Sequence, residues 1–110
     1  MVEKRVLWSQ DEIIVACALV VRNGWRGLRA TDKRVVDLSE LLRSSALARE
    51  GSLAGEKFRD RNGVQRKTFD LATRHWGYTG KRTKGGKLDD RVVAGFRADP
   101  EGMLAVADEI

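Results

Sequence analysis

The chain has 110 residues, of which 42% are hydrophobic and 34% are charged, and its formal net charge is +5. A chain of this length and composition folds as one globular domain, which excludes a disordered segment and leaves no room for two domains. The single cysteine and single histidine exclude a disulfide framework, a cysteine-rich zinc site and most histidine-based catalytic or metal centres. We therefore predict one domain over residues 1–110 that is not an enzyme and carries no cofactor.

No membrane or export segment is predicted. The longest apolar run, residues 13–21, is about half the length that a bilayer-spanning helix needs. Acidic residues stand at Asp11 and Glu12, where a signal peptide would need its apolar centre. A lone cysteine suits a reducing compartment. We expect a cytoplasmic protein with no membrane partner.

The first two predicted helices follow from capping and apolar spacing. Ser9 and Glu12 have the spacing of a capping box, so the first helix should run from about 10 to 22. It is apolar nearly all round, and we therefore expect it to be central. The second helix should run from about 32 to 44, and residues 46–49 could add a short turn.

The third predicted helix begins near 60–62 and ends near 76. Helical spacing places four residues on its inward stripe: Val64, Thr68, Leu71 and His75. Four others should face outward: Asn62, Arg66, Phe69 and Thr73. This helix should therefore be buried on a narrow stripe and expose cations to solvent.

Two further helices are predicted at the C-terminal end. One starts at about 88 or 89, where Asp89 and Asp90 favour the dipole of its first turn. The other has Asp99 as its cap and Pro100 at its first position. No stretch alternates between apolar and polar residues for long enough to predict a strand. The predicted fold class is all-α, with a trihelical core of the helix-turn-helix kind and two additional C-terminal helices. The layout of Trp8 and the third helix resembles that of Myb-SANT trihelical domains.

Positive charge is concentrated between Lys57 and Lys87. That segment holds ten Lys or Arg residues against Asp60 and Asp70 alone, so its net charge is +8. Clustered cations are typical of a surface that binds a polyanion, although a solvated basic surface without a partner is the alternative. Residues 78–87 form a glycine-rich basic loop that suits phosphate contacts but lacks the spacing of a nucleotide-binding P-loop.

A basic third helix on a trihelical scaffold predicts binding to double-stranded DNA, with that helix in the major groove and the basic loop on the phosphates. Asn62, Gln65 and Arg66 carry groups that can read purine edges. Phe69 could pack on a pyrimidine methyl group, or against the fourth or fifth helix. Such a protein would be associated with the nucleoid. The predicted DNA-binding residues are Trp25, Arg26, Arg59, Arg61, Asn62, Gln65, Arg66, Phe69, Thr73, Arg74, Tyr78, Lys81, Arg82, Lys84 and Lys87.

Five motifs follow one another along nearly the whole chain. They are Trp8-Ser9-x-Asp11-Glu12-Ile13; Val36-x-Leu38-Ser39-Glu40-Leu41-Leu42; Lys57-Phe58-Arg59-x-x-Asn62-Gly63-Val64-x-x-Lys67; Gly80-Lys81 through Gly86-Lys87-Leu88-Asp89; and Phe96-x-x-Asp99-Pro100. This pattern resembles the N-terminal domain of McrA-type, 5-methylcytosine-specific HNH restriction endonucleases. Arg61, Thr68 and Thr83-Lys84 depart from the Pro, aliphatic and Leu-Ser that are usual there. The resemblance implies a module that recognises methylated DNA, and the chain end at or just after a helix favours an excised domain with the nuclease downstream in cis.

Two other classes of function stay open. A protein-interaction module would use the fourth and fifth helices to dock a partner or a second copy. An RNA-binding domain would stack Trp25, Trp76 or Tyr78 on unpaired bases. Competition among duplex DNA, single strands and structured RNA separates these functions.

Overall fold

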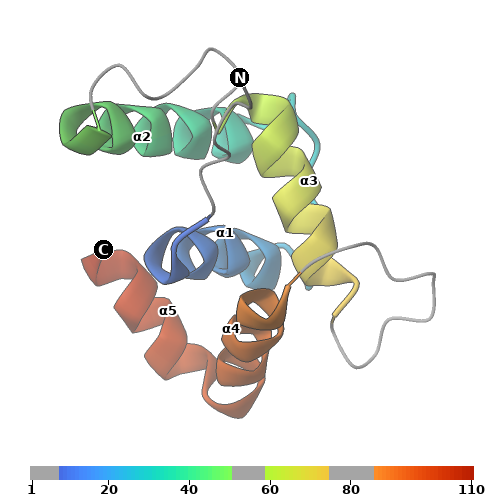
Figure 1. Ribbon diagram of the computed structural model, residues 1–110. Helices are drawn as coiled ribbons and strands as arrows, with labels where there is room; N and C mark the ends of the chain where they lie inside the picture. Colours follow the sequence, from blue (N-terminus) through green and yellow to red (C-terminus); the bar gives the residue numbers. More distant parts are fainter. Residues whose placement is uncertain (1–7, 51–58, 75–85) are drawn as a thin grey trace.

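The computed structural model describes residues 8–50, 59–74 and 86–110, and only the backbone of 45–50. Every regular element in these segments is an α-helix: α1 is Gln10–Arg22, α2 is Lys33–Glu50, α3 is Arg61–Ala72, α4 is Lys87–Ala98 and α5 is Pro100–Glu109 (Figure 1). The prediction of an all-α fold is confirmed. None of the helices in this part of the chain combines the length and the apolar character that crossing a bilayer requires.

Local sequence signals set most of the helix starts. Ser9 Oγ accepts a hydrogen bond from the Glu12 N–H at 3.2 Å, and Glu12 Oε1 accepts one from the Ser9 N–H at 2.9 Å, so the predicted capping box is confirmed. Asp60 caps α3 by accepting from the Gly63 N–H at 2.8 Å. Asp99 caps α5, whose first residue is Pro100 as predicted. Each cap satisfies an N–H group that the first helical turn leaves without a partner.

Two predicted helix ends are wrong. The second helix continues to Glu50 instead of ending near 44, and it includes the short turn predicted at 46–49. Good helix formers continue through this stretch, and no glycine or proline interrupts them before Gly51. The third helix ends at Ala72 instead of near 76. The Arg74 N–H bonds three residues back to the carbonyl oxygen of Leu71 at 3.2 Å, which tightens the last turn.

Helix α1 is the centre of the fold. Figure 1 shows it between α2 and α3 on one side and α4 and α5 on the other, and it packs against all four. Its residues Ala16, Cys17 and Val20 are completely buried, as are Leu71 of α3 and Phe96 of α4. A helix that is apolar on nearly all sides can bury all of those sides only when other helices surround it. The predicted central position of this helix is therefore confirmed.

The single cysteine, Cys17, is buried and has a thiol of low reactivity. Burial raises the pKa of the Cys17 thiol to about 12, and the Asp89 carboxylate adds to the rise. The thiol therefore stays protonated near neutral pH and packs as a small apolar group, in agreement with its position in the apolar run.

A buried ion pair joins α1 to the start of α3. The Arg59 guanidinium donates to the two carboxylate oxygens of Glu12 at 2.8 and 2.9 Å, and both side chains are at most 10% exposed. The same guanidinium lies 4.6 Å from the centroid of the Trp8 ring, and the Arg59 carbonyl oxygen accepts from the Ser39 hydroxyl at 2.6 Å. These contacts hold Arg59 in the left-handed region, at φ 49°. The expectation that Arg59 faces outward toward DNA is therefore wrong, because its charge is neutralised in the core.

A second ion pair ties α3 to α4. Lys67 Nζ lies 3.2 Å from both carboxylate oxygens of Asp89 and 5.4 Å from the centroid of the Trp8 ring. Asp89 is buried and also accepts from the Gly86 N–H at 3.3 Å. Asp89 therefore also attaches α4 to α3, a role that the sequence did not reveal.

We expect the Glu12→Gln substitution to lower the free energy of unfolding at neutral pH by roughly 3–5 kcal/mol, because it leaves the Arg59 charge buried without a counterion. Burial alone raises the pKa of Glu12, but hydrogen bonds from Arg59 and Ser9 outweigh it and hold the pKa below its ordinary value of 4.5. The stabilisation is therefore present above pH 4.5 and is lost as the pH falls through the lower folded-state pKa. Urea denaturation from neutral pH down to about pH 3 should show a steeper loss for the wild type than for the variant.

The matched control is Asp37→Asn, which removes the exposed pair between Lys33 and Asp37, 2.8 Å apart. This variant should keep nearly the wild-type stability and its acid dependence, because exposed pairs are screened by solvent. Equal acid slopes for the wild type and Glu12→Gln would contradict the assignment of the ion pair.

Candidate nucleic-acid interface

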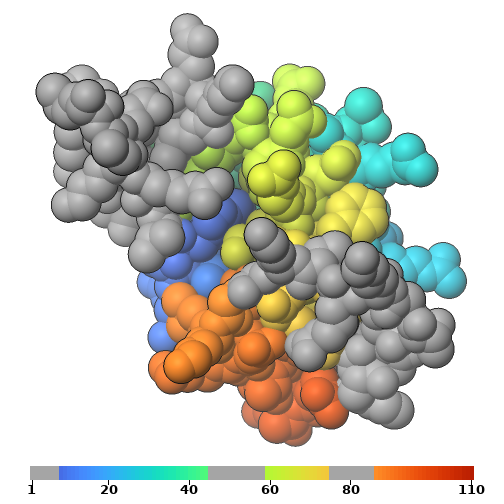
Figure 2. All heavy atoms as spheres, turned by 45° about the vertical axis from the view of Figure 1, so that its right-hand side comes forward, coloured from blue at the N-terminus to red at the C-terminus, as the bar shows by residue number. Residues whose placement is uncertain are grey.

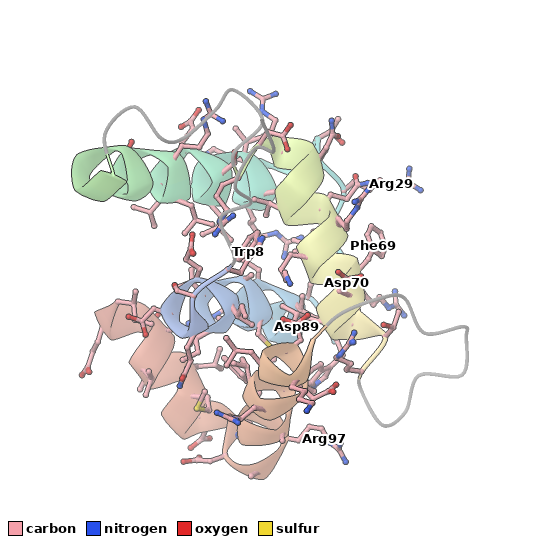
Figure 3. All side chains as sticks on the ribbon, in the orientation of Figure 1. Trp8, Arg29, Phe69, Asp70, Asp89 and Arg97 are labelled. Atoms are coloured by element: carbon pink, nitrogen blue, oxygen red, sulfur yellow. The ribbon has the colours of Figure 1, made fainter. Side chains whose placement is uncertain are left out.

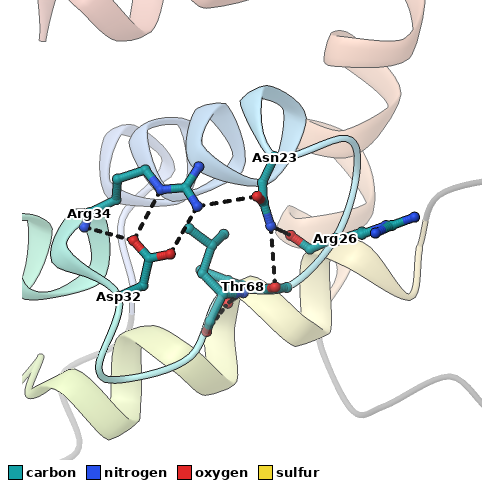
Figure 4. Close-up of polar contacts among 7 residues, drawn as sticks. Asn23, Arg26, Asp32, Arg34 and Thr68 are labelled. Carbon is teal, nitrogen blue, oxygen red and sulfur yellow. Dashed lines mark hydrogen bonds and ion pairs between the residues drawn. The ribbon is translucent and has the colours of Figure 1, made fainter.

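Polar contacts within the loop between α1 and α2 give it a defined shape (Figure 4). Asn23 Nδ2 donates to the carbonyl oxygens of Arg26 and Gly27 at 3.2 and 3.4 Å, and Asn23 Oδ1 accepts from the Arg34 guanidinium at 3.2 Å. Arg34 also donates to Asp32 from its backbone N–H and its guanidinium, at 2.9 to 3.0 Å. The Arg34 hydrogen bonds hold the pKa of Asp32 below its ordinary value. The charge of Arg34 is thus used to close the loop.

The loop begins with two residues in the left-handed region. Gly24 has a φ of 71° and Trp25 a φ of 62°, and the Trp25 N–H donates to the Val20 carbonyl oxygen at 2.8 Å. This conformation is unusual for a large side chain, and the half-buried Trp25 ring packs against the core. The next residue, Arg26, is exposed. Contact of Trp25 with DNA stays a prediction.

Helix α3 fastens the loop from its other side. Thr68 is completely buried, and its hydroxyl oxygen accepts from the Leu28 N–H at 3.0 Å. The same hydroxyl lies within donating distance of the carbonyl oxygens of Gln65 and Leu28, at 2.8 and 3.2 Å. Gln65 Oε1 accepts from the Ala30 N–H at 2.7 Å. Loop residues 27–30 therefore lie against α3.

These contacts create one cationic surface, which we name the arginine face and define as Arg26, Arg29, Asn62, Arg66 and Phe69. All five residues are exposed, two on the loop and three on the outer stripe of α3. Figure 3 shows Arg29 and Phe69 on the same side of α3, and Figure 2 shows the loop residues beside those of α3 on one surface. The predicted outward orientation of Asn62, Arg66 and Phe69 is confirmed.

Phe69 has a neighbour that the sequence did not reveal. Its ring packs on Gly27 of the loop, whereas the alternative raised from the sequence was packing against the fourth or fifth helix. The residue remains 39% exposed and so belongs to the arginine face.

Three other predicted DNA contacts have structural tasks. Gln65 is half-buried and holds the loop through Ala30. Thr73 is buried, and its hydroxyl donates back to the Asp70 carbonyl oxygen at 3.0 Å. Its predicted exposed position is wrong: Thr73 is the C-cap of α3, where its N–H still bonds to the Phe69 carbonyl oxygen at 3.1 Å, and its side chain is buried at the end of the helix. The side chain of Arg74 is only 8% exposed and lies 2.8 Å from Asp90, so the expectation of an outward cation is also wrong.

The remaining predicted residues divide into two groups. Arg61 is exposed at the first position of α3, next to the arginine face, and Lys87 is exposed at the first position of α4. The others, namely Tyr78, Lys81, Arg82 and Lys84, lie outside the described residues, as does His75. The predicted loop contacts with phosphate therefore stay predictions.

Arg29 is a residue of this surface that the sequence interpretation missed. The available signal was the composition of residues 24–31, which contain Arg26 and Arg29 and no acid. That signal was weak because the loop lies outside the strongly basic segment between Lys57 and Lys87. Only the contacts of Thr68 and Gln65 bring the loop to α3.

The chemistry available at the arginine face is hydrogen-bond donation by cations together with one flat apolar ring. Guanidinium groups bind phosphate oxygens and guanine edges, and the Asn62 amide both donates and accepts. Among the described residues, no group of three or more His, Cys, Asp or Glu side chains could hold a metal ion. The surface is therefore suited to recognising an anion or a base rather than to binding a metal there.

No protein-family model matches this chain, and neither a curated protein nor a solved structure does so. The resemblance of its motifs to McrA-type domains therefore stays a prediction. The function has to be argued from the surface itself.

Replacing Thr68 with Val should detach the loop from α3. Valine keeps the volume but leaves the buried Leu28 N–H without an acceptor, which we expect to cost roughly 1–3 kcal/mol of unfolding free energy. Hydrogen exchange of the Leu28 amide should become faster than in the wild type. Thr31→Val, at an exposed position of the same loop, should change neither quantity. Unchanged protection of the Leu28 amide in Thr68→Val would rule out the proposed attachment.

Proposed function

We propose that this chain binds double-stranded DNA through the arginine face. The observation that carries the proposal is that the loop with the exposed Arg26 and Arg29 is fastened to α3, which exposes Arg66, and that Arg29 lies on the same side of α3 as Phe69 (Figure 3). Of the nearby carboxylates, Asp32 is engaged with Arg34, and Asp70 lies beside Phe69 on α3 (Figure 3), so the three arginines outnumber the remaining acid. A net positive field on a fixed scaffold attracts a polyanion.

We propose further that α1, α2 and α3 act as a helix-turn-helix-like unit with the outer stripe of α3 in the major groove. In support, α2 packs against α3, and α1 packs against both. Residues 51–60 separate α2 from α3, which is longer than the tight turn of roughly three to four residues in a standard motif. The likeness therefore lies in helix packing and in the basic outer stripe of α3, and not in the turn.

The residues of the face divide naturally between the two kinds of contact. Asn62 and Arg66 are four residues apart on α3, so they are neighbours on one helical face and could reach adjacent base edges. Arg26 and Arg29 stand on the loop beside the helix, where phosphates of a strand bordering the groove would pass. In this arrangement the loop sets the position of the duplex and α3 reads it.

The motif resemblance adds a more specific proposal, that the DNA carries 5-methylcytosine and that the module serves a modification-dependent restriction endonuclease with an HNH domain in cis. Phe69 supports this because it places an apolar ring among the cations of the face. An apolar group of this kind has no phosphate to bind, and it suits the apolar surface of a base.

Arg29→Ala should reduce the salt dependence of DNA binding. Each phosphate contact contributes about 0.9 to the slope of log affinity against log salt, so its loss should lower the slope by roughly one. Fluorescence anisotropy on a duplex of roughly two helical turns, titrated at several salt concentrations, measures this slope. The matched control is Arg22→Ala, which removes an equal charge from the contact of α1 with Asp108 of α5. Equal slopes for Arg29→Ala and the wild type would remove the loop from the interface, and no binding by the wild type would refute the function.

A separate titration addresses the modification. The duplex that contains 5-methylcytosine should bind about fourfold more tightly than the same duplex without it. This factor corresponds to roughly 0.8 kcal/mol, the free energy gained by burying one methyl-sized group. The comparison uses both duplexes at one salt concentration, because phosphate contacts are common to both. Equal affinities would remove the claim of methylation sensing and leave the claim of DNA binding in place.

A further inference from the structure

The ring of Phe69 is held with one flat side against the backbone of Gly27. A Cβ built on Gly27 would lie 2.3, 2.6 and 2.7 Å from Cδ1, Cε1 and Cγ of Phe69. Cε1 and Cγ are the two ring neighbours of Cδ1. A point above the ring plane is almost equally far from an atom and its two neighbours, whereas a point at the ring edge is clearly farther from the neighbours. Gly27 therefore covers a face of the ring and not its edge.

The ring of Phe69 stays partly open to solvent. The residue is 39% exposed although Gly27 covers one face of its ring, which leaves the opposite face for a ligand. Arg66 is its neighbour three residues earlier on α3, and Arg29 lies on the same side of the helix (Figure 3). The structure thus offers a fixed, flat apolar surface with Arg29 and Asp70 labelled beside it in Figure 3 and with Arg66 one helical turn away. Such a combination is the one that proteins use to stack an unpaired nucleobase and hold its phosphates.

We propose that Phe69 is a stacking platform for a single base that has left the DNA double helix. The inference rests on the proposed DNA binding at the arginine face and names the state of the DNA it prefers. Paired bases present only their edges in a groove, so the flat face of a base reaches this ring only after unstacking. Arg26, Arg29 and Arg66 would hold the flanking phosphates. Because an unpaired base costs least to extrude, the face should prefer duplexes that contain one.

The test compares three duplexes of one sequence: fully paired, with a one-nucleotide bulge, and with an abasic bulge at the same place. The two bulged duplexes share a distorted backbone, and only one of them has a base to stack. We expect the wild type to bind the base-containing bulge roughly tenfold more tightly than the abasic bulge. In Phe69→Ala the two bulges should bind equally, whereas Arg22→Ala, which lies outside the arginine face, should keep the wild-type preference. Helical circular dichroism checks that the variant is folded.

Phe69→Leu separates stacking from simple apolar contact. Leucine keeps apolar bulk at the site but has no flat face, so the preference for the base-containing bulge should be lost as in Phe69→Ala. A leucine variant that retains the preference would overturn the stacking proposal and assign the ring to a methyl or other apolar contact.

Gly27→Ala gives an independent variant that leaves the phenylalanine in place. Gly27 has no left-handed φ, so alanine is allowed by the backbone, but its methyl group would occupy the space of the ring and displace it. We expect the preference for the base-containing bulge to be lost in Gly27→Ala, with no additional loss in the double variant with Phe69→Ala. Equal binding of both bulges by the wild type, with duplex binding intact, would overturn this inference and leave the proposed function standing. A wild type that binds none of the three duplexes would refute the proposed function itself.

Discussion

The buried carboxylate of Glu12 determines where α3 lies relative to α1. It completes the capping box of α1 by accepting from the Ser9 N–H through Oε1, and it accepts from the guanidinium of Arg59 through both oxygens. Arg59 immediately precedes Asp60, the N-cap of α3, so the first turn of α3 is fixed to the first turn of α1. A buried ion pair is seldom more stabilising than apolar packing of the same volume. Its effect here is positional, because it connects the starts of α1 and α3 and places the Arg59 guanidinium over the ring of Trp8.

The inner and outer sides of α3, which the ion pair fixes relative to α1, have different roles. On the inner side, Thr68 binds the loop and Lys67 binds Asp89 of α4, so neighbouring elements hold the helix on either side. The next outward position, Arg66, is one residue from Lys67 and about 100° away around the helix axis. Adjacent cations therefore have opposite roles, one tying two helices together and the other exposed on the arginine face. The rigidity of the inner contacts gives the outer residues a fixed base.

Local signals made much of the fold predictable. The capping box of α1, the apolar circumference of α1 and the Asp99-Pro100 start of α5 each depend on residues close together in the sequence. The ion pairs could not be predicted in this way. Arg59 pairs with a residue 47 positions away and Arg74 with one 16 positions away, and local spacing carries no information about either partner. The count of charge drew attention to Arg59 and Arg74, which lie in the most basic segment, and passed over Arg29, which lies outside it. The side chains of Arg59 and Arg74 are buried, whereas Arg29 is exposed, and the count of charge does not show this difference.

Pairing with a carboxylate is a second difference between the other cations and those of the arginine face. In the described part of the chain, Arg22, Lys33, Arg34, Arg59, Lys67 and Arg74 each have a carboxylate within 4.0 Å. Arg26, Arg29 and Arg66 instead stand on a loop and a helix that are locked together, around a ring whose covered face requires a glycine beneath it. Like charges gathered on a rigid surface repel one another, and an anionic partner relieves that repulsion without any rearrangement of the backbone. Preorganisation of this kind favours binding, since the cost of ordering the surface is already met when the chain folds.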